Sequence, residues 1–269
     1  MCVYSIEIII TMINYMDMKK TFLLGLMVLA AMTMTSCMSV NLGNGDIDTT
    51  PTQVSNLNEM TTMQPFDELE IAGAFKVIYE QGESHSVRIE ASEQALKEMT
   101  VYVKDGELRI RKAVNKPTVS FSDVKLYVTS PTIEGIEIAG SGAFIASKPI
   151  TTRDQKTEIA GSGKILLVGV TGVETDMEIA GSGNIEIGQL DTESAKAEIA
   201  GSGDVNLGVL NCKKFNIEIA GSGNVNCEHI DADDVHTEIA GSGDVNLKGT
   251  VRHQSKDIAG SGKVNISEK

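Results

Sequence analysis

The chain has 269 residues and a formal net charge of -14 at pH 7, from 37 acidic and 23 basic residues. Binding to nucleic acid, or to an anionic membrane through lysines, needs a basic surface, so this balance argues against both classes of partner. Aromatic residues make up 4% of the chain and tryptophan is absent, which argues against a sugar-binding platform of exposed rings.

Residues 1–36 are predicted to be an upstream extension and a lipoprotein signal peptide, and to lie outside the fold. Two lysines precede the apolar run 22–31, and Met34-Thr35-Ser36-Cys37 closes it. The run is too short to span a bilayer, and small residues before a cleavage point are typical of a secretory signal. Cys37 therefore resembles the lipid-attachment cysteine of a bacterial lipoprotein. The alternative is a plain secreted protein, and in either case the normal signal starts at Met18.

Residues 37–64 are rich in Asn, Gly, Asp, Thr and Met without a period, which predicts a flexible tether. Residues 65–135 form a different block of short alternating runs. Within it, Asp105-Gly106 predicts a hairpin turn between two strands, and residues 92–99 are a candidate short helix. We expect this block to be an N-terminal antiparallel β cap, because the terminal units of a stack protect an open edge.

From residue 136 to residue 269 one five-residue string, Ile-Ala-Gly-Ser-Gly, recurs about every 20 residues. Its seven copies begin at Ile138, Ile159, Ile179, Ile199, Ile219, Ile239 and Ile258. A fixed period of this length is typical of a solenoid, in which a repeat buries its apolar face only against a neighbour. The sequence therefore predicts an all-β fold, a parallel β-helix of about seven 20-residue coils with right-handed crossovers.

Apolar and polar residues alternate on both sides of each Gly-Ser-Gly, which predicts two short strands joined by a tight turn. Inward positions after the turn are filled by pairs such as Val205 with Leu207 and Ile185 with Ile187. The next corner has a further apolar site, filled by Val170, Leu190, Leu210 and Ile230. Each coil should therefore aim two strands and a corner at one core.

Identical residues in successive coils should stack into rows on the outer surface. One expected row is acidic and consists of Glu137, Glu158, Glu178, Glu198, Glu218, Glu238 and Asp257. Like charges one coil apart should raise the pKa of these carboxyls, and screening by salt is favoured over specific calcium binding. A second expected row consists of Asn206, Asn226, Asn246 and Asn265, whose amides should bond along the rod.

The remaining chemistry of the sequence is sparse. Cys227 occupies an inward site and Cys212 a turn, and a disulfide between them is not favoured because they occupy different places on the cross-section. Asp204 and Asp244 follow Gly-Ser-Gly, where a turn role is favoured over calcium binding. No catalytic, cofactor-binding or metal-binding residue is predicted, because every candidate group repeats from coil to coil.

The opening block FDELEIAGAFKVIYEQG, the later VYVKDGELRI and the repeated IEIAGSG resemble the head GIN domain family of auto-transporter adhesins, found as exported proteins in Bacteroidetes. The resemblance covers residues 64–266. It implies a β-helical fold and an envelope location, and it supplies no catalytic or binding residues.

The sequence thus predicts a non-enzymatic, lipid-anchored protein of the outer membrane that serves as an adhesin or surface scaffold. Its membrane contact would be the lipid on Cys37, and its ligand would be a surface glycan or protein. The alternative is a carbohydrate-binding or carbohydrate-processing β-helix. An uncapped C-terminal coil edge predicts weak self-association. The sequence leaves open whether the protein faces the periplasm or the outside.

Overall fold

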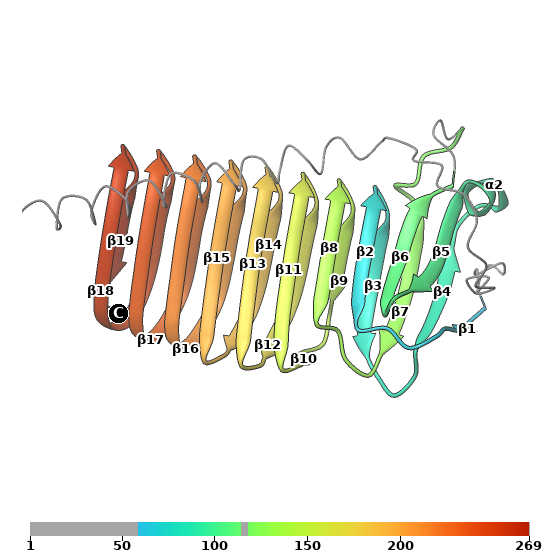
Figure 1. Ribbon diagram of the computed structural model, residues 1–269, viewed down its shortest axis with the longest axis horizontal. Coiled ribbons are helices and arrows are strands. Elements are labelled where there is room, and N and C mark those ends of the chain that lie inside the picture. Colours follow the sequence, from blue (N-terminus) through green and yellow to red (C-terminus); the bar gives the residue numbers. More distant parts are fainter. Residues whose placement is uncertain (1–58, 114–117, 269) are drawn as a thin grey trace, which may run out of the picture. The chain divides into compact units, whose positions relative to one another are not determined.

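The structure is a computed structural model that describes residues 59–113 and 118–268. The signal peptide, Cys37 and most of the predicted tether lie outside these residues. The elements, numbered as in Figure 1, are β1 (Thr61–Thr62), β2 (Glu68–Gly73), β3 (Lys76–Gln81), β4 (Ser86–Glu90), α2 (Glu93–Lys97), β5 (Met99–Lys104), β6 (Glu107–Lys112), β7 (Lys125–Ser130), β8 (Gly135–Gly140), β9 (Ala143–Ala146), β10 (Ile150–Thr151), β11 (Asp154–Gly161), β12 (Lys164–Thr171), β13 (Glu174–Gly181), β14 (Asn184–Asp191), β15 (Ser194–Gly201), β16 (Asp204–Gly221), β17 (Asn224–Gly241), β18 (Asp244–Gly260) and β19 (Lys263–Ser267).

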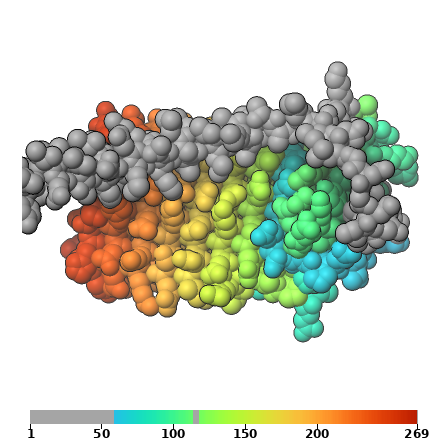
Figure 2. Space-filling view, viewed as in Figure 1, coloured from blue at the N-terminus to red at the C-terminus, as the bar shows by residue number. Residues whose placement is uncertain are grey.

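The strands wind into a parallel β-solenoid, as the repeats predict. β11 pairs in parallel with β8 on one side and with β13 on the other, and β12 pairs likewise with β9 and β14. The register advances by a whole repeat, so that Ile159 lies beside Ile138 and Ile179. About seven coils follow one another as successive bands in the ribbon and space-filling views (Figures 1 and 2). The right-handed sense remains a prediction.

The tight turn of each coil depends on both glycines of Gly-Ser-Gly. Gly221 has a φ of 138°, and a Cβ placed there would lie 2.1 Å from the carbonyl oxygen of Gly201. A Cβ on Gly223 would lie 2.2 Å from the carbonyl oxygen of Gly203. The close approach lets the amide of Ser222 donate a hydrogen bond of 2.8 Å to the Gly201 oxygen. Only glycine combines this backbone angle with this spacing.

The core is a set of apolar rows inside the coils. The isoleucines of the five copies from Ile159 to Ile239 are at most 2% exposed. The predicted corner row is also buried, and its members are Val170, Leu190, Leu210 and Ile230. Each coil thus covers the apolar face of its neighbour, which is the main source of stability in such a stack.

The N-terminal block caps the solenoid, but its antiparallel part is smaller than predicted. β2 and β3 form a further coil that pairs in parallel with β8 and β9. On their other side β6 and β7 also pair in parallel with β2 and β3. Among the described strands, antiparallel pairing is confined to β1 with β4, β4 with β7, and β5 with β6. The reason is that β2 keeps the glycine turn of the repeat, since Gly73 has a φ of 141°.

Two local predictions in this block are confirmed. Asp105 and Gly106 have φ values of 56° and 84°, and they join β5 to β6 as a hairpin. Helix α2 spans Glu93–Lys97, and the Ser92 hydroxyl caps it by accepting a 3.1 Å hydrogen bond from the Ala95 amide. In the described part of the chain, no helix is long and apolar enough to cross a membrane.

Candidate functional site

The one site residue predicted from the sequence, Cys37, lies outside the described residues, so its lipid attachment stays a prediction. Cys212 and Cys227 are both free thiols. Cys227 is buried at the inward position predicted for it. Burial raises the pKa of Cys212 to about 12 and that of Cys227 to about 11. Both thiols are therefore protonated at neutral pH and are poor nucleophiles.

The acidic row forms on the outer surface in the predicted register. Glu178, Glu198 and Glu218 lie beside one another in β13, β15 and β16. Lysines two residues earlier on the same face relieve part of the repulsion. Lys196 lies 2.6 Å from the Glu198 carboxylate and 3.9 Å from that of Glu218. Lys156 pairs in the same way with Glu158 and, at 3.7 Å, with Glu178.

The pKa values of three carboxyls in this row, Glu137, Glu178 and Glu218, are raised. Burial is the largest cause for each, because partial removal from water disfavours the charged form. Neighbouring carboxylates add to the shift, for example Glu198 beside Glu218. For these three carboxyls the predicted direction is confirmed, but like-charge repulsion is a smaller cause than burial.

The asparagine row bonds along the rod as predicted. The Asn226 amide donates to the Asn206 side-chain oxygen at 3.0 Å, and Asn246 and Asn265 continue the chain of bonds at 3.0 and 2.9 Å. The turn position after Gly-Ser-Gly also bonds between coils, since Asp204 accepts the Asn224 backbone amide at 3.0 Å. These side chains therefore satisfy one another. Nowhere in residues 59–113 and 118–268 do three or more His, Cys, Asp or Glu side chains form a group that could hold a metal ion.

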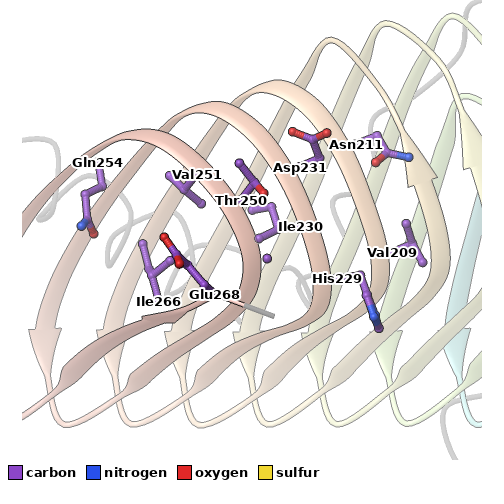
Figure 3. Close-up of a pocket in the computed structure, with 11 residues that line it drawn as sticks. Val209, Asn211, His229, Ile230, Asp231, Thr250, Val251, Gln254, Ile266 and Glu268 are labelled. Carbon is purple, nitrogen blue, oxygen red and sulfur yellow. The ribbon is translucent and has the colours of Figure 1, made fainter.

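The last coil departs from the repeat at its corner. Gly249 takes the place of Ile230 in the buried corner row, and the register shifts between Cys227 and Ile230 because this coil is one residue shorter. An open cavity of about 520 Å³ lies beside Gly249 at this end of the solenoid (Figure 3). Ile230, Val251 and Ile266 supply its apolar walls, and polar side chains, among them Gln254 and Glu268, lie around it.

The same coil also exposes its inward rows. Ile258 is 39% exposed, although its counterparts in the preceding coils are at most 2% exposed. Lys256 and Gln254 stand in the rows that Thr237 and Val235 fill in the coil before. The repeat period alone did not reveal these substitutions. The one available signal was the spacing of 19 residues between Ile239 and Ile258, where most copies are 20 apart.

The sequence of this solenoid matches one known protein family. A family model described as "Putative auto-transporter adhesin, head GIN domain" matches residues 65–211 and 207–268. The chain belongs to this family. A search of curated proteins gave no match.

Solved structures of similar fold include proteins from Parabacteroides and Bacteroides species. A protein from Parabacteroides distasonis titled a putative lipid binding protein is 24% identical with a TM-score of 0.65. A putative adhesin from Parabacteroides merdae is 20% identical with a TM-score of 0.65, and one from Bacteroides fragilis is 20% identical with a TM-score of 0.58. Each match covers 78% of this chain and 95% of the other. At these identities the likeness shows the fold alone.

Proposed function

We propose that this head GIN domain protein is a lipid-anchored, non-enzymatic component of the cell envelope that acts as a rigid adhesin or surface scaffold. The observation that carries the proposal is that the outer rows repeat from coil to coil, and that the asparagines among them bond to one another. An enzyme needs one position whose groups differ from their surroundings. The asparagine and glutamate rows and the polar turn position after Gly-Ser-Gly instead repeat similar polar groups along the rod.

The rod form suits a protein that holds a surface away from the membrane. Coils are stacked at roughly 4.8 Å, each bonded to the next by main-chain hydrogen bonds along nearly its whole length. The anchor in this proposal is a lipid on Cys37, since the protein's net charge of -14 gives no attraction to anionic headgroups. A single acyl chain binds a membrane only marginally, so stable anchoring requires more than one chain on that cysteine.

An accessibility experiment tests the surface location. An epitope tag is placed after Lys269, and antibody binding is measured on intact cells and on lysed cells. We expect labelling of intact cells, and reduced adhesion to host glycans or proteins when the gene is deleted. Labelling that requires lysis would place the protein in the periplasm and refute adhesion. Turnover of a polysaccharide by the purified protein would instead favour the carbohydrate-processing alternative.

A further inference from the structure

The outer edge of the last coil differs from the strand edges of the coils before it. β17 pairs with β16 on one side and with β18 on the other. In contrast, β19 covers only Asp244–Lys248 of β18, and no described strand covers Gly249–Gly260. A main chain without a partner strand is a template for strand addition. Here the edge lies directly beside the cavity at Gly249.

We propose that Gly249–Gly260 is a strand-addition site for an extended, acidic segment of another protein, which inserts one aliphatic side chain into the cavity. The cavity volume of about 520 Å³ lies within the range of protein ligand pockets. An aliphatic side chain above Gly249 would restore the interrupted row of Val170, Leu190, Leu210 and Ile230. The same segment would cover Ile258 and remove its exposed surface from water.

The charge of the edge selects an acidic occupant. The preceding strand segment, residues 230–241, carries four carboxylates and no lysine or arginine. The edge itself carries Arg252 and Lys256 against one carboxylate, Asp257. Arg252 already pairs with Asp231 and Asp233 of the preceding coil, at 2.9 and 3.2 Å, so the covered side of the edge shows the same charge complementarity. Carboxylates three and seven residues after the aliphatic residue would lie above Arg252 and Lys256.

The same charges disfavour a second copy of this chain. Two copies could meet only end to end at this edge, because β1, β4, β5 and α2 occupy the other end of the solenoid (Figure 1). An antiparallel pair of edges would bring two Lys256 ammonium groups into one apolar interface. Inward-pointing charges of this kind are a known means of blocking edge-to-edge association. A different, acidic chain meets no such penalty.

The chain itself provides a probe. A labelled peptide of residues 230–241 with Thr237→Glu has an aliphatic residue followed by carboxylates three and seven positions later. Its binding to the full chain carrying Cys37→Ala, which prevents acylation, is followed by fluorescence anisotropy at about 0.15 M salt, where long-range repulsion is screened. We expect saturable binding. Ile230→Gly in the peptide should weaken it by about 10- to 100-fold, the loss expected for one buried aliphatic side chain.

Two variants of the protein locate the site. Ile258→Asp places a charge on the uncovered row and should abolish peptide binding while the protein stays folded, which its circular dichroism spectrum checks. Val168→Asp alters a valine that is 49% exposed on a distant coil, and it should leave binding unchanged. Absence of binding at millimolar peptide, or equal binding to the Ile258→Asp variant, would overturn the proposal. Dimerisation through this edge that peptide does not reverse would overturn it in favour of a second copy.

This inference names a partner class for the proposed scaffold, and its test uses purified protein. A failure of peptide binding would leave the surface location and adhesion untouched, because the epitope experiment decides those. Conversely, a periplasmic location would leave the strand-addition site intact and change only the source of its partner.

Discussion

Replacing Gly221 with alanine should unfold the stack locally and lower its stability strongly. The new Cβ would lie 2.1 Å from the Gly201 carbonyl oxygen, at a residue with a φ of 138°. Holding a non-glycine residue in such a backbone region costs about 1–3 kcal/mol. Moving the coils apart also lengthens the bond from the Ser222 amide to Gly201, and an unsatisfied amide costs about 1–3 kcal/mol.

Together these terms predict a loss of about 2–6 kcal/mol for Gly221→Ala. For a domain of this size each kcal/mol shifts the melting temperature by about 2–4 °C, so a drop of about 4–24 °C is expected. Gly169→Ala is the matched control. Its Cβ would meet the nearest atoms at 3.5 Å, an ordinary contact, and the loss of backbone freedom in the unfolded chain should stabilise it by about 0.4–1 kcal/mol.

Thermal unfolding followed by circular dichroism compares the two variants. Hydrogen exchange then locates the change, which should be largest in β15, β16 and β17, because coils contact only their neighbours. If Gly221→Ala melts within about 2 °C of Gly169→Ala, the turn tolerates a side chain and the reasoning about stacked glycines is wrong.

Other predictions concern the anchor, the acidic row and the open edge. Cys37→Ala should release the protein from membranes or block its maturation, and retention of the variant through detergent-free washes would contradict the lipid anchor. In the folded protein the pKa values of Glu137, Glu178 and Glu218 are raised above 4.5, so the folded state binds more protons than the unfolded chain. The free energy of unfolding should therefore increase as pH falls from neutral through the folded pKa values towards 4.5. Melting curves from pH 7 to 5 check this, and replacing Glu178 and Glu218 with glutamine should flatten the trend. Millimolar calcium should act only as screening salt, and a larger shift that disappears when Glu198, Glu218 and Glu238 become glutamine would instead show a metal site. Self-association through the C-terminal edge should be weak and should strengthen in Lys256→Thr, which sedimentation at high concentration can measure.

The sequence predicted the solenoid well because its determinants are local and repeated. A glycine turn every 20 residues and a period of two between turns fix both the coil length and the inward rows. Once the coils share a period, the parallel register follows without knowledge of distant contacts. The asparagine and glutamate rows are direct consequences of that register.

The N-terminal block was harder to predict for a physical reason. Alternating strands such as β2, β3, β6 and β7 show which face is buried, but they do not specify a partner strand or its direction. The Asp-Gly turn specifies one antiparallel pair, β5 with β6, and this direction does not hold for the whole block. Gly73 was the clue that β2 and β3 continue the stack, since it repeats the turn of the later coils.

The candidate site at the C-terminal end arises where the repeat fails. Along the middle of the rod the outer asparagines bond to their own copies one coil away, so a partner would have to replace an existing bond to gain a new one there. At Gly249 the copy is missing, and at Ile258 the row has no cover. Unsatisfied backbone, exposed apolar surface and a local reversal of charge occur together only there among the described coils. We therefore expect a partner to bind at this irregular end, because there it can pair with the uncovered backbone and cover the exposed apolar surface.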